Sequence, residues 1–295
     1  MKLKSQRRAI VSPMDWPLPG PDGFDLEQAL RHDQIEFWYQ PKIDLRKKRL
    51  VGLEAFARFC DSDGNILSGA ELISGASDRV LVGLTERALR STLKTTANLL
   101  EIGIDVRIAV NANVAALMRL PIAEMVRRYQ LSGRKSPSMI FDVTEKEVLG
   151  SYDKLRKVSQ DFSRNGLCIA VDDFGASLFS TVRKEEAYEK ITQTFDAIRR
   201  LGNIPFAEMK IDRTLARNCH ESPDRQRVCE YIIKMTHEFG ASAVAVGVEN
   251  AKDLATLKRL GCDIGQGFLF GRPMTEDEFL MLLWDRGVRA KQKAQ

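Results

Sequence analysis

The sequence predicts an α/β protein in which strands alternate with helices and close into a (β/α)8, TIM-like barrel. Apolar runs alternate with segments whose apolar residues recur at helical spacing over most of the 295 residues. Polar side chains stand in or at the end of six of these runs. In a closed parallel barrel the strand ends converge on one mouth, whereas an open doubly wound sheet would gather polar residues at a single switch point.

The chain is predicted to open with two strands, residues 37–45 and 50–59, joined by the charged turn Arg46 to Arg49, so that the first strand is antiparallel. Apolar runs predict further strands at 106–110, 138–143, 167–171, 207–211, 241–248 and 264–270. Helical spacing predicts helices at 84–99, 122–129, 152–164, 225–239, 252–260 and 275–284. Gly240 and Gly261 mark two helix ends, and Thr275 with Glu278 forms a capping box.

One further helix is predicted from Arg183 to Leu201, packed over the rim of the barrel. Its apolar stripe is expected to face inward or into a partner chain, and it consists of Ala187, Ile191, Phe195 and Ile198. An ordinary barrel helix that has grown longer would show the same pattern.

The two ends of the chain are expected to be tails outside the barrel domain. Four of the ten prolines fall between Pro13 and Pro21, so residues 1–23 are expected to form a flexible N-terminal tail. Residues 24–286 are predicted to form the barrel domain, and residues 287–295 a C-terminal tail.

Charge and cysteine usage exclude several classes of protein. The net charge of +5 is spread along the chain, without the dense basic face of a DNA-binding protein. The sequence contains no run of 18 apolar residues, so it predicts no membrane span. The five cysteines lie far apart without a CxxC pair, which argues against disulfides and zinc and favours a reduced, cytoplasmic location.

The polar residues at the strand ends suggest a metal site. Carboxylate and amide oxygens are the ligands of hard cations such as Mg²⁺ and Mn²⁺, and Asp173 offers a second metal position. Lys210 could hold a water or a phosphate oxygen. Alternatively, each acid could cap a helix or pair with an arginine. The six strand-end residues are Glu54, Asn111, Asp142, Asp172, Lys210 and Gln266.

Several motifs in order resemble the EAL family, whose domains hydrolyse or bind cyclic di-GMP, and the resemblance covers roughly Phe24 to Trp284. The segments YQPKIDL and GLEAFARF resemble the signature region, and VNANV the strand with the metal-binding asparagine. FDVTE resembles the E-x-T-E strand, AVGVE resembles AEGVE, and GQGFLFGRPM resembles the closing segment. VDDFG and MKID are intact.

The resemblance implies an EAL-type barrel and a set of site roles. It implies metal binding by Glu54, Asn111, Asp142, Asp172 and Asp173. It implies catalytic roles for Lys210, Gln266 and Glu145. It implies nucleotide contacts for Gln40, Phe56, Arg58, Phe174, Glu249 and Pro273, for which a forked guanidinium on phosphate and phenyl stacking on guanine are suitable chemistry.

Four departures from the family pattern weigh against catalysis. Val246 stands where the family has a catalytic glutamate, and valine can neither bind a metal nor take a proton. Asp142 is shorter than the usual glutamate, and Phe56 is bulkier than the usual leucine. The loop after Gly175, which in the family helps to place metal and connects to the dimer interface, is replaced by a longer, more helical segment.

We therefore expect a degenerate EAL domain that regulates by binding cyclic di-GMP, a protein partner or a second copy. The alternative is an active phosphodiesterase that opens cyclic di-GMP to pGpG with Mg²⁺ or Mn²⁺. A module that binds no nucleotide is a third class. The retained Gln40, Arg58, Phe174 and Glu249 argue against it, and Phe56 argues for it.

Overall fold

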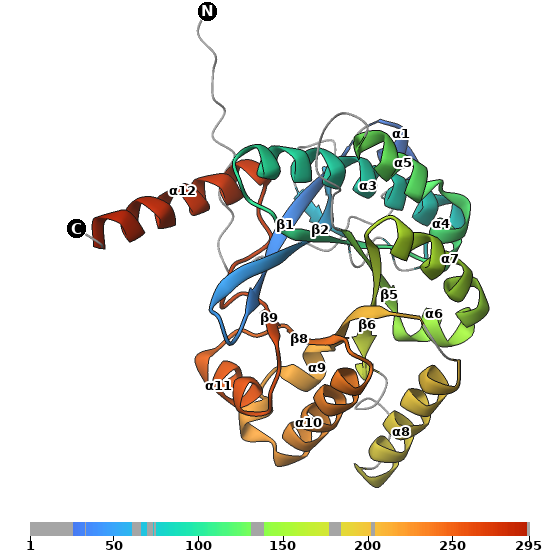
Figure 1. Cartoon of the computed structure of the whole chain (residues 1–295), viewed down its shortest axis with the longest axis vertical. Helices are drawn as coiled ribbons and strands as arrows, with labels where there is room; N and C mark the ends of the chain where they lie inside the picture. Colours follow the sequence, from blue (N-terminus) through green and yellow to red (C-terminus); the bar gives the residue numbers. More distant parts are fainter. Residues whose placement is uncertain are drawn as a thin grey trace, which may run out of the picture.

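The barrel closes through an antiparallel strand. The computed structural model describes residues 26–293 except 33, 61–65, 70–72, 74, 131–138, 177–183 and 202–203. The strand order is β1-β9-β8-β7-β6-β5-β4-β2-β3, and an added β1–β2 pairing makes a ring of every strand but β3 (Figure 1). β1 runs antiparallel to both β2 and β9, while the pairs from β2 through β4 to β9 are parallel. The predicted TIM-like barrel with an antiparallel opening strand is confirmed.

Every strand except the short β3, which the sequence did not predict, lies close to a predicted position, and β9 stops where a turn begins after Gln266. They are β1 (Ile35–Asp44), β2 (Arg49–Cys60), β3 (Ile66–Ser68), β4 (Arg107–Asn111), β5 (Met139–Thr144), β6 (Leu167–Phe174), β7 (Phe206–Ile211), β8 (Ser242–Val246) and β9 (Ile264–Gln266).

The helices surround this ring, and none among the described residues is both long and apolar enough to cross a membrane. They are α1 (Leu26–Arg31), α3 (Asp78–Glu101), α4 (Val114–Arg119), α5 (Ile122–Gln130), α6 (Glu145–Gly150), α7 (Tyr152–Arg164), α8 (Lys184–Leu201), α9 (Arg213–Ala216), the 3₁₀ turn η2 (Cys219–Glu221), α10 (Pro223–Glu238), α11 (Ala251–Arg259) and α12 (Glu276–Lys293).

Two differences from the predicted helices have a local cause. α12 does not end at Trp284 but continues to Lys293, because the following residues are mostly good helix formers. The short helices α4, α6 and α9 directly follow strands and are capped by the side chains of Asn113, Thr144 and Asp212. They are too short to show helical spacing. The predicted tail at 1–23 lies outside the described residues.

The apolar core lies between the strands and the surrounding helices. Its main cluster includes Phe141, Ile169 and Ile211 from the strands and Leu93 from α3. Inside the ring, a small cluster of Ala109, Ile140 and Ala170 leaves room for larger polar side chains. The barrel interior is therefore where the polar residues of the strands meet.

Helix α8 packs against its own barrel. Ile191 and Phe195 are fully buried, which confirms the inward face for these two residues. The ring of Phe195 lies 4.8 Å from that of Phe174 and 5.9 Å from that of Phe239, between centroids. The side chains of Ala187 and Ile198, and all of Arg183, lie outside the described residues. A dimer through this buried face loses its support.

Replacing Phe195 by alanine should destabilise the fold by about 3–5 kcal/mol, because it removes a buried ring and leaves a cavity under β6. Gln193→Ala, at an exposed position on the same helix, should change the free energy of unfolding by less than about 0.5 kcal/mol. Urea unfolding of the two variants checks this. Equal effects would contradict the role of Phe195 in holding α8 to the barrel.

Candidate functional site

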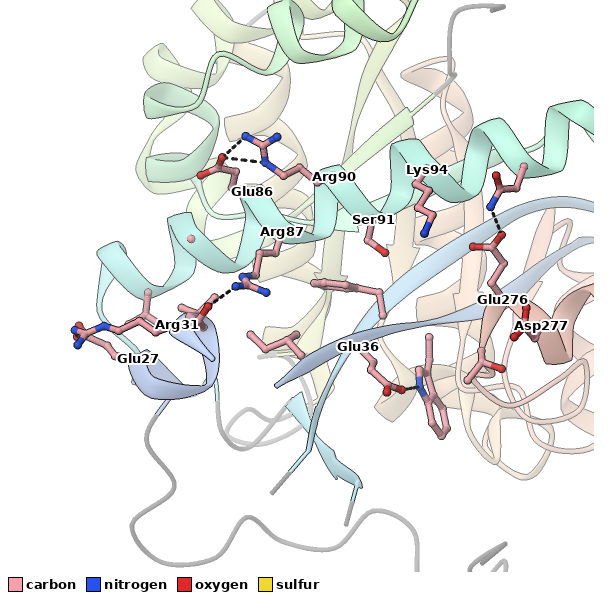
Figure 2. Close-up of a pocket in the computed structure, with 18 of the residues that line it drawn as sticks. Glu27, Arg31, Glu36, Glu86, Arg87, Arg90, Ser91, Lys94, Glu276 and Asp277 are labelled. Atoms are coloured by element: carbon pink, nitrogen blue, oxygen red, sulfur yellow. Dashed lines mark hydrogen bonds and ion pairs between the residues drawn. The ribbon is translucent and has the colours of Figure 1, made fainter. Parts of the chain in front are cut away.

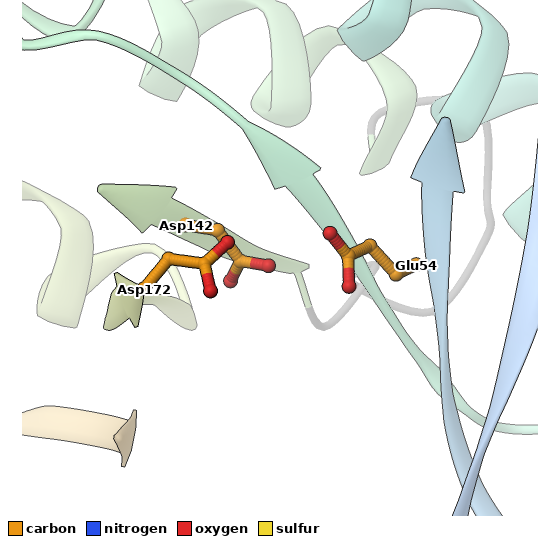
Figure 3. Close-up of side chains that lie close together, drawn as sticks. All are labelled: Glu54, Asp142 and Asp172. Atoms are coloured by element: carbon orange, nitrogen blue, oxygen red, sulfur yellow. The ribbon is translucent and has the colours of Figure 1, made fainter. Parts of the chain in front are cut away.

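One ammonium group gathers three carboxylates inside the barrel. The Nζ of Lys210 on β7 donates to Glu54 on β2 at 3.0 Å, to Asp142 on β5 at 2.9 Å and to Asp172 on β6 at 2.7 Å. One oxygen from each acid lies within 4.8 Å of the others, and Figure 3 shows the three side chains pointing toward one another. The sequence prediction that these strand ends meet is confirmed.

Two amides complete the arrangement around Glu54. The Nε2 of Gln266 on β9 donates to Oε2 of Glu54 at 2.7 Å and to Oε1 of Gln40 at 3.1 Å. The Nδ2 of Asn111 on β4 donates to Oε1 of Glu54 at 3.0 Å. Gln40 in turn donates to the carbonyl of Gly271, which ties β1 to the segment after β9.

Strand register explains why these residues meet. Gln40 is the register partner of Glu54, Asn111 that of Asp142, and Val246 that of Gln266. Partners on adjacent strands point to the same face of a sheet, so all of these side chains point into the barrel. The half-buried Val246 thus adds an apolar side chain to the inner face beside Gln266.

The charges inside the barrel are unequally balanced. Burial opposes the ionisation of Glu54, but Lys210, Lys42 and two amide hydrogen bonds outweigh it and hold the pKa of Glu54 below its usual value. Burial, with Glu54 and Asp172 nearby, raises the pKa of Asp142 to about 7 against the effect of Lys210. The three carboxylates raise the pKa of Lys210 well above its usual value despite burial. Lys210 therefore stays charged, and Asp142 is the acid that takes a proton.

The cluster fits a single hard cation. Its donors are carboxylate oxygens, and Oδ1 of Asp142 is buried with no hydrogen-bond partner, which leaves a lone pair for a metal. A cation would also find the amide oxygen of Asn111, the atom not used in the bond to Glu54.

Asp173, the proposed ligand of a second metal, stands apart from this cluster. Its backbone has φ 53°, in the left-handed region, and its amide donates to Oδ1 of Asp172 at 2.8 Å. Burial, with Asp172 and Asp212 nearby, raises the pKa of its carboxyl to about 6. The three gathered acids are Glu54, Asp142 and Asp172, so a role for Asp173 at a metal stays a prediction.

A second buried ion pair was missed by the sequence analysis. Nζ of Lys42 on β1 lies 2.5 Å from Oε2 of Glu208 on β7, and both side chains are almost fully buried. Gly52 is the register partner of Lys42, and a Cβ added at Gly52 would lie 3.0 Å from the Arg107 carbonyl oxygen and 3.4 Å from Cε of Lys42. A lysine inside the apolar strand YQPKIDL was the available signal, but its partner could not be found without the strand register.

Three of the proposed nucleotide contacts share the inner face of the β1–β2 hairpin. Phe56 and Arg58 follow Glu54 at two-residue spacing, and Gln40 lies opposite Glu54. The guanidinium of Arg58 donates to the carbonyl of Ala57 at 2.9 Å and lies over the rings of Trp38 and Phe56, at 5.6 and 5.8 Å from their centroids. Burial lowers the pKa of Arg58 to about 10, which leaves it cationic at neutral pH.

Two acids whose pairing with Arg58 would hold it away from the inner face, Asp44 and Asp212, have other partners among the described residues. Asp44 instead accepts from the amides of its own turn. Asp212 accepts from Thr214. Arg58 is therefore not held away from the inner face by either acid.

The remaining predicted residues fall into different surroundings. Phe174 is fully buried against Phe195 and packs in the core, so a contact of its ring with a nucleotide stays a prediction. Oε2 of Glu145 accepts from the amide of Gly175 at 3.0 Å, and so holds the backbone that follows β6. Glu249 pairs with Arg217 at 3.2 Å and is partly exposed. Pro273 is half-buried in the segment that Gln40 ties to β1.

The raised pKa of Asp142 predicts a pH dependence of stability. A carboxyl with a pKa of about 7 when folded and about 4 when unfolded binds more protons in the folded state between these values. Stability should therefore fall by up to a few kcal/mol as the pH rises from about 4 to 7. Asp142→Asn should flatten this fall, while Asp161→Asn, at an exposed position on α7, should retain it. Chemical unfolding at pH 5 and pH 7.5 measures the difference, and a wild-type slope in Asp142→Asn would contradict the assignment.

Known proteins are similar to this chain in sequence. The chain is 27% identical over 262 residues to the cyclic di-GMP phosphodiesterase RocR of Pseudomonas aeruginosa, which aligns with 88% of this chain and 62% of RocR. It is 24% identical over 260 residues to the signaling protein YkoW of Bacillus subtilis, covering 86% of this chain and 30% of YkoW. The chain thus spans only part of the length of these curated relatives.

Solved structures are similar to this chain in fold. A structure of the phosphodiesterase PaMucR in complex with c-di-GMP superposes with a TM-score of 0.72 at 27% identity, covering 86% of this chain and 98% of that one. The FimX EAL domain from Pseudomonas aeruginosa, bound to c-di-GMP, superposes with a TM-score of 0.68 at 21% identity, covering 84% and 94%, and shares the fold. The sequence model of the family described as "EAL domain" matches residues 25–184 and 187–273 of this chain. This chain belongs to the EAL domain family.

Proposed function

We propose that this chain is an EAL domain that binds cyclic di-GMP, hydrolyses it weakly or not at all, and acts as a regulator. Its relative RocR is named as a cyclic di-GMP phosphodiesterase, and PaMucR was solved in complex with c-di-GMP. The proposal extends that ligand to this chain. Residues 24–286 are the unit to which it applies, and the five free cysteines suit a reducing cytoplasm.

The main support for the proposed lack of hydrolysis is the aliphatic side chain of Val246. It lies on the inner face of β8 beside Gln266, in a ring whose other strands contribute oxygen and nitrogen groups. A hydrocarbon at this point can neither hold a cation nor accept a proton from water. A general base typically contributes about 10²–10⁴-fold to a rate, so its absence alone makes turnover slow.

Mg²⁺ or Mn²⁺ would be held by Glu54, Asp142 and Asp172, with Asn111 and Asp173 as further candidates. When bound, such a cation activates water and stabilises charge on a phosphate. Lys210 already donates to each of the same three carboxylates and offsets part of their charge, and Gln266 donates to Glu54. These contacts keep the site assembled whether or not a cation is present, which supports a binding role.

The inner face of the β1–β2 hairpin supports nucleotide binding. Arg58 offers a guanidinium that can form two parallel hydrogen bonds to a phosphate, and Phe56 offers a ring beside it. Glu249 could accept from guanine N–H groups after leaving Arg217, and Pro273 lies in the adjoining segment. The output of binding would pass to a protein partner or to a second copy of the chain.

The alternative is an active phosphodiesterase that produces pGpG. It is favoured by the retained cluster, since three acids within 4.8 Å and the unpartnered oxygen of Asp142 suit a cation. Turnover assays decide between the two functions.

Wild-type protein should hydrolyse cyclic di-GMP at least about a hundredfold more slowly than an active EAL phosphodiesterase, with Mg²⁺ or Mn²⁺ present. Val246→Glu should raise turnover, because it restores a carboxylate beside Gln266. Val246→Gln, of similar size but without the charge, is the matched control and should not raise it. Formation of pGpG, followed by chromatography, is the measurement. Wild-type turnover at the rate of the active enzyme would refute the proposal.

Arg58→Ala should weaken cyclic di-GMP binding about tenfold or more, because a charge-assisted pair of hydrogen bonds contributes about 1.5–3 kcal/mol. Affinity should be the same in EDTA and in Mn²⁺. Arg90→Ala, which removes an exposed arginine on α3, should bind like wild type. Calorimetric titration tests this, and either equal affinity in Arg58→Ala or binding that requires Mn²⁺ would show the account of the site to be wrong.

A further inference from the structure

A second pocket lies at the opposite end of the barrel from the acidic cluster. It has a volume of about 960 Å³ and is lined by the β1–β2 turn, the first residues of β4 and β8, and the end of α11. This volume is within the range of small-molecule sites. We call it the basal pocket; it shares no residue with the proposed cyclic di-GMP site and does not depend on that function.

The basal pocket collects five basic side chains from three parts of the chain. Arg46 and Lys47 come from the β1–β2 turn and Arg49 from the start of β2 directly after it, Arg107 comes from the start of β4, and Lys258 from α11. Among the described residues, none of these five side chains makes an ion pair or a hydrogen bond.

The three acids of the basal pocket are already engaged. Oδ1 of Asp44 accepts from the backbone amides of Arg46 and Lys47, at 2.9 and 2.7 Å. Glu208 pairs with Lys42, as described above. Oδ2 of Asp263 accepts from the amide of Ala243 at 2.8 Å and lies 2.7 Å from His237. Hydrogen bonds to amides do not cancel the charge of a carboxylate, so only Glu208, paired with Lys42, is matched by a lysine. The five cations outnumber the two remaining acids of the pocket.

The turn that supplies three of the cations is held in shape. Besides the two amides on Asp44, the amide of Lys48 donates to the Asp44 carbonyl at 2.8 Å, and Lys48 has φ 53°. Arg107 is close enough to Cys168 to affect its thiol. Burial raises the pKa of this thiol, and the positive charge of Arg107 lowers it. All five basic side chains are exposed, and their residues line the hollow of the basal pocket.

A larger groove on the same molecule provides a contrast. It lies between α1, β1, α3 and the start of α12, with a volume of about 1030 Å³ (Figure 2). Three of the four arginines that line it are engaged: Arg31 pairs with Glu27, Arg90 pairs with Glu86, and Arg87 donates to the carbonyl of Leu30. Compensation of this kind is absent from the described residues of the basal pocket.

We propose that the basal pocket binds a compact compound with several phosphate groups, such as tripolyphosphate or a nucleoside triphosphate. Guanidinium groups bind phosphate through paired hydrogen bonds, and lysines add point charges. No aromatic side chain is among the lining residues described, so bases have no ring on which to stack. Recognition should therefore depend on the phosphates, and a single-stranded nucleic acid is the less suitable ligand.

Calorimetry in EDTA with tripolyphosphate, ATP and GTP tests this proposal on the full chain. All three should bind wild type with similar affinity. Arg49→Gln/Arg107→Gln should weaken each at least about tenfold. A second pair, Arg46→Gln/Lys258→Gln, which like the first changes only exposed side chains, should have the same effect. Lys154→Gln/Lys157→Gln, which removes two exposed charges on α7, is the matched control and should bind like wild type.

Three results would overturn the proposal. One is the absence of binding by any of the three compounds. Another is equal affinity in wild type and in the folded pocket variants, as judged by circular dichroism. The third is binding of an oligonucleotide of the same charge without binding of tripolyphosphate, which would assign the basic residues to nucleic acid.

Discussion

The interior of this barrel is organised by the ammonium group of Lys210. It reaches from β7 to carboxylates on β2, β5 and β6, and so links four strands through a single charged atom. Buried carboxylates are tolerated only when a cation or hydrogen bonds compensate them. Burial opposes the ionisation of both acids, and the sharing of one lysine among three acids helps to separate their pKa values. The pKa of Glu54 is low because Lys42 and two amides also favour its ionised form, whereas the pKa of Asp142 stays high.

The pair of Lys42 and Glu208 extends this design along the barrel. It joins β1 to β7, and Lys42 also favours the ionised form of Glu54. Small residues in the same interior, including Ala109 and Ala170, make room for these long side chains. The barrel is thus filled by charged groups in compensating sets, with the apolar core placed between strands and helices.

The sequence was sufficient for the fold because strands buried on both faces are apolar, and six such runs each carried a polar residue at or near the end. A closed barrel brings those ends together, so the cluster around Glu54, Asp142 and Asp172 could be predicted. The Lys42–Glu208 pair could not, because its members are 166 residues apart and meet only through strand register. The burial of Phe174 likewise depends on α8, whose packing a single sequence does not reveal.

The antiparallel first strand has a consequence for the order in which the chain folds. β1 is made early but is enclosed only when β9 pairs with it, and Gln266 must reach Gln40 across 226 residues. Contacts of such high sequence separation carry a loop-closure cost and slow folding. During synthesis, Glu54 and Lys210 have already emerged when Gln266 is still to come. The hydrogen bond from Gln266 to Glu54 is therefore made late, and a chain cut before β9 cannot complete the hydrogen bonds around Glu54.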